Sequence, residues 1–218
     1  MISRNEISLS LPPVQKGVGC EFCPLNKVPG IRKVHGQVNG SEVFLWGMAP
    51  GPDENEKGLE FVGKSGELLW HELGLVGIER SRCDVQNVVR CFPTREDSRP
   101  VLKMRDPSEE EIHCCSKFTK MAIEKSQAKL HIVFGVVAAK TLLEGEYQKG
   151  RKTFRSDKLR AQVLCMWHPS YLVRNGCSAG RTQEPSEKLK QWRRDFDWAA
   201  RLLEKQLIHT GRADQFSV

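Results

Sequence analysis

Cys20 and Cys23 are separated by two residues, a spacing at which two thiolates can bind one metal centre from a tight turn. Further cysteines follow at Cys91 and at the adjacent pair Cys114 and Cys115. A structural zinc site usually has two such close pairs, whereas a larger iron–sulfur cluster tolerates scattered ligands. The cysteines alone therefore favour an iron–sulfur cluster, with zinc or a set of unrelated buried thiols as the alternatives.

Two glycine-rich stretches surround a pair of carboxylates and a phenylalanine. The first, GMAPGPDEN, contains Asp53 and Glu54, and the second, GLEFVGKSG, contains Phe61. Neither stretch matches a known nucleotide-binding fingerprint. The pattern indicates a rigid loop that forms a pocket with Phe61 as a stacking platform, and a phosphate-binding loop or a flexible connection is the alternative.

A third group, HPSYLVR, follows an apolar run near the end of the chain. His168 begins it, and a histidine in this place can be either a reacting group or a capped structural residue. A tight turn at Pro169 would point Tyr171 and Leu172 outward, next to Arg174. Exposed apolar side chains of this kind are unusual on a surface that binds nothing.

These groups must be positioned by regular elements, and the apolar pattern predicts which. Strands that are apolar throughout and alternate with helices indicate a parallel sheet covered on both faces. We expect an α/β fold, a three-layer α/β/α sandwich with a central, mostly parallel four-stranded sheet. In such sheets ligands bind beyond the carboxyl ends of the strands, where Asn87, Gly135 and His168 lie. The predicted strands cover 43–46, 84–89, 130–135 and 163–167, and the helices 67–75, 109–127, 136–143 and 186–206.

Composition limits the class of protein. The chain of 218 residues carries a formal charge of +7, and a single domain over 1–218 is expected, with residues 1–41 irregular and held by the metal centre. No run of about 18 apolar residues is present, and the N-terminus has no apolar signal region, so we expect a cytoplasmic monomer without a membrane partner. The basic stretch 149–160 is either a solvated loop or a phosphate-contacting surface.

In their order along the chain, these motifs resemble the family 4 (iron–sulfur) uracil-DNA glycosylases of the uracil-DNA glycosylase superfamily. The resemblance covers roughly residues 20–205. Its motifs are Cys20-x-x-Cys23, Gly47-Met-Ala-Pro-Gly51 with Glu54, Phe61-Val-Gly63, Asn87-Val-Val-Arg-Cys91, Glu111-x-x-x-Cys115, Gly135 and His168-Pro169-Ser170.

The resemblance selects the metal ligands. It implies a 4Fe-4S cluster on Cys20, Cys23, Cys91 and Cys115, with a structural role, and it leaves Cys114 as a neighbour.

The resemblance also implies a reaction. A DNA glycosylase extrudes a nucleotide from double- or single-stranded DNA and hydrolyses its N-glycosidic bond, leaving an abasic site. Phe61 would stack on the base, Asn87 would hydrogen-bond its edge, and His168 would stabilise negative charge on the departing base. Glu54 would orient or activate water or stabilise the cationic sugar. Gly47, Met48 and Ala49 would complete the base site, and Ser170, Tyr171, Leu172 and Arg174 would contact DNA.

Three departures from the family pattern are present, of which Met48 and the longer loop leave the substrate base open and Arg90 matters little. Met48 replaces a glutamate, Arg90 replaces a lysine, and the stretch from 91 to 115 is longer than usual and contains Arg95, Arg99, Lys103 and Arg105. A glycosylase for a hypermodified base, such as a decorated phage cytosine in anti-phage defence, is therefore an alternative to a uracil enzyme. A non-catalytic DNA-binding relative and an electron-transfer protein are the alternatives from other classes.

Overall fold

The computed structural model describes residues 17–94, 104–180 and 184–209. The Cys91–Cys115 connection is described only at its two ends, so Arg95, Arg99 and Lys103 lie outside the described residues. In these ranges, no helix is both long and apolar enough to cross a membrane. The elements in chain order are η1 (Cys20–Phe22), η2 (Pro24–Lys27), β1 (Val43–Gly47), α1 (Pro52–Lys57), α2 (Lys64–Leu75), η3 (Arg80–Arg82), β2 (Cys83–Asn87), α3 (Glu109–Lys125), β3 (Leu130–Phe134), α4 (Val136–Leu142), β4 (Thr153–Ser156), β5 (Ala161–Met166), α5 (Pro169–Arg174) and α6 (Glu187–His209).

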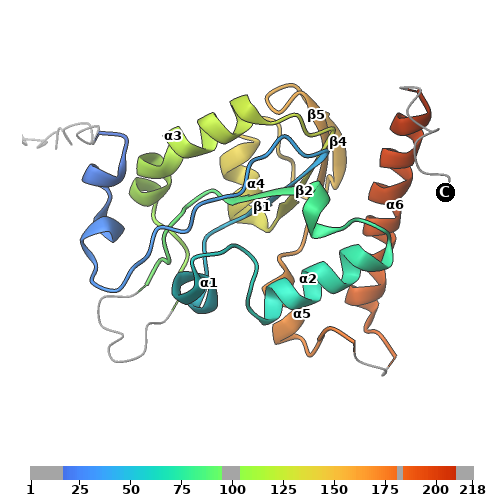
Figure 1. The fold of residues 1–218 in the computed structure, drawn as a ribbon, viewed down its shortest axis with the longest axis horizontal. Coiled ribbons are helices and arrows are strands. Elements are labelled where there is room, and N and C mark those ends of the chain that lie inside the picture. Colours follow the sequence, from blue (N-terminus) through green and yellow to red (C-terminus); the bar gives the residue numbers. More distant parts are fainter. Residues whose placement is uncertain (1–16, 95–103, 181–183, 210–218) are drawn as a thin grey trace, which may run out of the picture.

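The strands form one sheet of five in the order β2-β1-β3-β5-β4. β1 pairs in parallel with both β2 and β3, and β3 pairs in parallel with β5. The carboxyl ends of these four strands therefore meet at one edge of the sheet, which is where an open α/β sheet binds its ligands. The predicted α/β sandwich with a mostly parallel sheet is confirmed (Figure 1).

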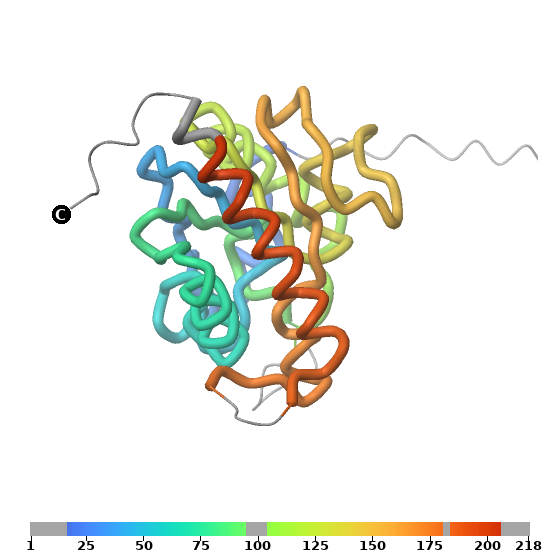
Figure 2. The backbone as a smooth tube through the Cα atoms, turned by 90° about the vertical axis from the view of Figure 1, so that its right-hand side faces the viewer, coloured from blue at the N-terminus to red at the C-terminus, as the bar shows by residue number. Residues whose placement is uncertain are grey.

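Helices cover both faces of the sheet, as Figures 1 and 2 show, with α3 and α4 on one face and α2, α5 and α6 on the other. Alternate residues of one strand serve opposite faces: Leu45 packs in the cluster with α2 and α6, whereas Phe44 and Trp46 pack in the cluster with α4. Trp192 and Phe196 of α6 are fully buried against the sheet. Burial on both faces explains why β1, β3 and β5 are mostly apolar, although β2 buries Asp84, Gln86 and Asn87.

The predicted number of strands is wrong by one, because β4 lies within the basic stretch. β4 runs antiparallel to β5 and pairs Thr153 with Leu164 and Ser156 with Ala161. It is an edge strand whose residues alternate between exposed and buried, so Arg155 points to solvent while Phe154 packs in the core. A half-exposed edge strand carries no continuous apolar run, and its charges are typical of an exposed edge.

The N-terminal part of the described chain is irregular, as predicted. Its regular structure from residue 17 to residue 42 consists of the short helices η1 and η2 and isolated bridges that join Lys33 to Cys91 and Gln37 to Val85. The backbone N–H of Val34 donates to the carbonyl of Arg90 at 2.7 Å. This segment thus runs beside the β2 end of the sheet and leads back to the cysteines.

Candidate active site

A cavity of about 550 Å³ opens at the carboxyl ends of the parallel strands. This size falls within the range of roughly 300–1,000 Å³ that is typical of ligand sites. Of the residues predicted to bind the base or DNA, the cavity is lined by Met48, Ala49, Glu54, Phe61, Asn87, His168, Ser170 and Arg174. The structure therefore brings together residues from motifs more than a hundred positions apart.

His168 follows β5 and caps the short helix α5. Its Nδ1 accepts a hydrogen bond from the backbone N–H of Ser170 at 3.1 Å and lies 2.8 Å from the Ser170 hydroxyl. Burial lowers the pKa of His168 to about 4, and the charge of Arg174 acts in the same direction. The ring is therefore neutral at pH 7, and since Nδ1 is an acceptor, its proton lies on Nε2.

Gly135 makes room for this histidine. It adopts a φ of 88°, and a Cβ there would lie 3.5 Å from the Cβ of His168. A side chain at this position would be strained by the left-handed backbone, although its Cβ would meet His168 only in ordinary van der Waals contact. The last residue before α4 therefore sets the wall opposite the histidine.

Asn87 ends β2 and points under the end of β1. A Cβ on Gly47 would lie 2.0 Å from Asn87 Oδ1, so only glycine permits this approach. The Asn87 amide Nδ2 donates to Oε2 of Glu60, a buried carboxylate that the sequence analysis did not select. No sequence signal marks Glu60, because a single glutamate beside a phenylalanine has no recognisable pattern.

Phe61 forms an apolar wall of the cavity. Its ring makes edge contacts with Phe134 at 6.0 Å and Trp70 at 6.4 Å, measured between ring centroids. Its backbone adopts a φ of 51°, a left-handed conformation that is costly for a bulky residue and is found mostly at functional sites. Two contacts hold it: Trp70 Nε1 donates to its carbonyl at 2.9 Å, and Gly66 packs where a Cβ would lie 2.0 Å from that oxygen.

Glu54 ties the two glycine-rich stretches together. Its Oε2 accepts from the N–H of Gly51 at 3.0 Å, and its Oε1 accepts from Val62 at 3.0 Å and Gly63 at 3.1 Å. Each oxygen of the carboxylate is therefore engaged by backbone amides. This arrangement gives Glu54 a positioning function for the loop that carries Phe61.

One predicted DNA contact is wrong for this conformation. Leu172 was expected to be exposed, but it is fully buried in the core cluster of α2, α5 and α6. The turn at Pro169 begins helix α5, and a one-turn helix lying on the sheet points its third residue after proline inward. Tyr171 is half-buried, and it contacts Trp167, which is 44% exposed and was not selected from the sequence.

The long connection before α3 borders the mouth of the cavity. Its described end supplies Met104, Arg105 and Asp106 to the lining, none of which the motifs indicated as site residues. The Arg105 guanidinium donates to Glu111 at 2.8 Å and 2.5 Å, so this cation is paired within the chain rather than directed at a phosphate.

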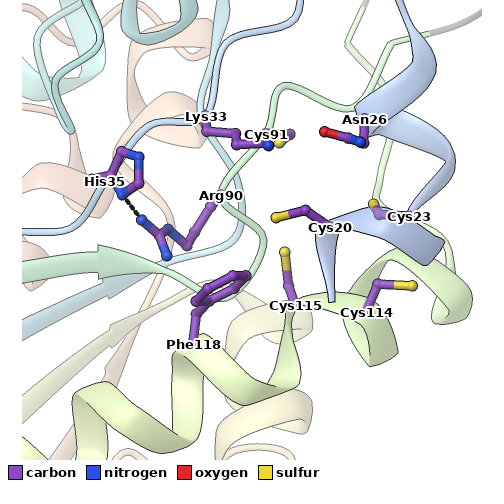
Figure 3. A pocket seen from close by; sticks show the side chains of 10 residues that line it. All are labelled: Cys20, Cys23, Asn26, Lys33, His35, Arg90, Cys91, Cys114, Cys115 and Phe118. Atoms are coloured by element: carbon purple, nitrogen blue, oxygen red, sulfur yellow. Dashed lines mark hydrogen bonds between the residues drawn. The ribbon is translucent and has the colours of Figure 1, made fainter. Parts of the chain in front are cut away.

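A second, smaller cavity of about 60 Å³ is lined by cysteines. Cys20 and Cys23 reach it from η1 and its C-cap, Cys91 from the segment after β2, and Cys114 and Cys115 from α3. Figure 3 shows the sulfurs of Cys20 and Cys115 facing one another and the Cys114 sulfur turned away. The Cys114 thiol instead lies 3.8 Å from the carbonyl of Gly17, to which it donates.

Two thiols of this cavity, those of Cys23 and Cys91, are protonated at pH 7. Burial raises the pKa of Cys23 to about 11 and that of Cys91 to about 12, and repulsion from Cys115 adds to each. Within the described ranges, no set of three or more histidine, cysteine or acidic side chains is placed to hold a single metal ion. The cysteines therefore surround a space instead of converging on a point.

Positive and aromatic groups border the same cavity. The Arg90 guanidinium lies over the Phe118 ring at 4.4 Å and donates to Nδ1 of His35, as Figure 3 shows. Lys33 also lines the cavity. These cations would partly offset the negative charge of a thiolate-bound group.

The profile of the uracil DNA glycosylase superfamily matches residues 35–196. This match covers most of the chain. The chain belongs to the uracil DNA glycosylase superfamily. The predicted membership is confirmed, and with it the class of enzyme, an N-glycosyl hydrolase acting on DNA.

Three relatives with similar sequences are each named type-4 uracil-DNA glycosylase. A protein of Thermotoga maritima, named type-4 uracil-DNA glycosylase, is 31% identical over 72% of this chain and 79% of its own length. Relatives of that name from Pyrobaculum aerophilum and Archaeoglobus fulgidus are 28% and 29% identical, over 76% and 73% of this chain and 85% and 81% of their own lengths. The family 4 resemblance is thereby confirmed.

Proposed function

We propose that this enzyme excises uracil from DNA by hydrolysing the N-glycosidic bond of an extruded deoxyuridine. The observation that carries the proposal is the convergence of Phe61, Asn87 and His168 on one cavity in a superfamily member. These three residues supply a flat apolar wall, an amide and a neutral imidazole. Recognition of an extruded pyrimidine requires a stacking surface and hydrogen bonds to its edge.

His168 acts on the departing base. Cleavage of the C–N bond leaves negative charge on the pyrimidine, mainly on the oxygen next to the glycosidic nitrogen. A neutral His168 holding its proton on Nε2 can donate a hydrogen bond to that oxygen while Ser170 fixes the ring through Nδ1. Removing a preorganised donor of this kind typically slows a reaction by about 10²–10³-fold.

Carboxylates besides Glu54 are available to hold the hydrolytic water. The oxygens of Glu54 are engaged by Gly51, Val62 and Gly63, and Met48 offers no carboxylate at the cavity wall. Asp53 and Asp106 line the same cavity and are exposed. We assign the binding of water to this pair and the holding of the loop to Glu54.

DNA contacts extend from the cavity along α5. Ser170 and Arg174 line the cavity, and the Arg174 guanidinium donates to the Ser170 hydroxyl at 3.1 Å. Tyr171 and Trp167 form a tilted aromatic pair beside them, with ring centroids 5.8 Å apart. An aromatic pair next to an exposed arginine is suited to stacking on bases and contacting a phosphate.

The cysteine cavity fits an iron–sulfur cluster held by Cys20, Cys23, Cys91 and Cys115. All four donors are thiols, the ligand type that iron–sulfur clusters require, and they surround a space wider than one ion occupies. Such a 4Fe-4S cluster would supply a covalent tie between η1, the segment after β2 and α3. Base binding and bond cleavage proceed on residues of the other cavity.

Mass spectrometry of the bases released from a panel of DNA substrates tests the proposal. The panel contains uracil, cytosine, 5-hydroxymethylcytosine and glucosylated hydroxymethylcytosine, in single- and double-stranded form. We expect free uracil and an abasic site. Release of a modified cytosine without uracil would overturn the assignment of the base, and no release from any substrate would overturn the assignment of the reaction.

A further inference from the structure

Glu60 is a buried carboxylate directly behind the cavity, 1% exposed and adjacent in the chain to Phe61. Asn87 Nδ2 donates to its Oε2. The other oxygen, Oε1, is buried without a hydrogen-bond partner, and so is Oδ1 of Asn87. The two residues therefore form a pair in which Nδ2 of Asn87 is hydrogen-bonded, while one acceptor oxygen of each residue has no partner.

Charges near Glu60 do not form an ion pair with it. The Arg80 guanidinium donates at 3.0 Å to the backbone carbonyl of Glu60, not to its carboxylate. Burial raises the pKa of Glu60 to about 8; the charge of Glu54 acts in the same direction, and hydrogen bonds from Asn87 and the charge of Arg80 act against it. With a pKa of about 8, Glu60 is mostly protonated at pH 7 and becomes an unpaired buried carboxylate only as pH rises.

A carboxylate accepts hydrogen bonds and donates none, whereas an asparagine amide has one donor and one acceptor end. Turning the Asn87 amide over would place Oδ1 against an ionised Glu60, and two acceptors would then repel each other. An ionised Glu60 thus holds the Nδ2 end of the amide and leaves Oδ1, in the space that Gly47 provides, as the acceptor for the base.

We propose that Glu60, once ionised, is a positioning residue that fixes the Asn87 amide in one orientation, so that the cavity favours uracil over cytosine increasingly as pH rises. The proposal rests on the proposed function, because it assigns a specificity determinant to the same site. Uracil presents a donor at N3 and an acceptor at C4, and cytosine presents the reverse order. An amide held in one orientation matches only one of these edges, whereas an amide free to turn matches both.

The protonation of Glu60 gives the proposal a distinctive signature. A protonated carboxyl can donate to Oδ1 as well as accept from Nδ2, so it tolerates either amide orientation. Discrimination between the two bases should therefore rise with pH as Glu60 ionises. Glu54 and Arg80 are the charged groups that act on it, and the Arg80 guanidinium donates to the Glu60 backbone carbonyl rather than to its carboxylate.

Binding of two uncleavable oligonucleotides tests the proposal, one with 2′-fluoro-deoxyuridine and one with 2′-fluoro-deoxycytidine at the target position. The Kd ratio is measured for the wild type, Glu60→Gln and the control Glu56→Gln from about pH 6 to about pH 9, a range that spans the expected ionisation. Glu56 is exposed on α1 and lies outside the cavity lining. Glutamine keeps the shape but accepts and donates, so it no longer selects one orientation of Asn87.

We expect the wild-type Kd ratio to favour uracil increasingly with pH, by about tenfold across the range. Binding cytosine requires the turned amide, in which the hydrogen bond from Asn87 to the ionised Glu60 is replaced by a repulsion between two acceptors. In Glu60→Gln the ratio should be low and independent of pH, and Glu56→Gln should match the wild type. A wild-type ratio that does not change with pH, or an unaltered ratio in Glu60→Gln, would overturn the proposal. If the wild type releases uracil and one of these two results is found, this inference alone is refuted. If the wild type releases no uracil, the proposed function is refuted.

Discussion

The base cavity and the cysteine cavity are assembled in different ways. The base cavity lies at the ends of paired strands, and its loops are held by backbone hydrogen bonds to Glu54, by a hydrogen bond from Trp70 and by close glycine contacts. The cysteine cavity joins short 3-10 helices, an irregular segment and one helix. The first is held by contacts within the chain, whereas the proposed cluster would join the segments that carry the four thiols of the second.

The largest expected effect of a single substitution therefore concerns the cysteine cavity. Cys115→Ser should lower the free energy of unfolding by about 4 kcal/mol, the upper end of single-substitution effects, because the tie between α3 and η1 is lost. Cys114→Ser is the matched control, since the Cys114 thiol donates to Gly17 and points away from the other sulfurs. Iron content, visible absorption and thermal melting are measured. Equal iron loss in the two variants would contradict the assignment of ligands.

A second substitution tests whether close backbone contacts hold the base cavity. Gly66→Ala places a Cβ 2.0 Å from the Phe61 carbonyl oxygen, so we expect a loss of about 3 kcal/mol in stability and a displaced Phe61. Gly74→Ala in the same helix meets nothing within 4 Å and should be neutral or stabilising. Denaturant unfolding and uracil-release rates check both variants. Similar effects of the two alanines would show that this contact does not hold the cavity.

A third test uses pH. The pKa of Glu60 is raised by burial to about 8, so between its ordinary value of 4.5 and about 8 the folded state binds a proton that the unfolded state has lost. Stability from this group is present at low pH and is lost as pH rises through that range, with a slope approaching about 1.4 kcal/mol per pH unit. Glu60→Gln should remove this slope. Urea unfolding at several pH values measures it, and an identical slope in wild type and variant would contradict the burial argument.

The smallest expected effect distinguishes the two ends of the basic stretch. Because β4 is antiparallel to β5, Lys152 lies near Trp167 on the cavity side, and Arg160 lies at the opposite end of the strand. Arg151→Ala should weaken DNA binding and lower the salt dependence of the affinity by about 0.9 in log–log slope, as expected for one lost phosphate contact. Lys158→Ala, at the far end, should leave both unchanged. Weaker DNA binding by Lys158→Ala with no effect of Arg151→Ala would contradict this prediction and would place the bound DNA at the end of β4 away from the cavity.

Much of the fold follows from local patterns, and the exceptions have physical reasons. Three of the four parallel strands, β1, β3 and β5, are mostly apolar, which makes them predictable, whereas β4 alternates Phe154 with exposed Arg155 and lacks such a run. Motif order also predicts the meeting of Phe61, Asn87 and His168. The burial of Leu172 depends on how α5 packs, and the hydrogen bonds of Glu54 and Glu60 depend on segments brought together only by the fold.

The central claim is that the strand-end cavity cleaves the glycosidic bond with His168 stabilising the departing base. Single-turnover uracil release by the wild type, His168→Ala and the exposed control His113→Ala tests it most directly. We predict that His168→Ala is slower by about 10²–10³-fold. Its iron content should be unchanged and its melting temperature only slightly lower, because the cap of α5 is lost, and His113→Ala should match the wild type. Release at the wild-type rate by a folded His168→Ala enzyme would contradict the account.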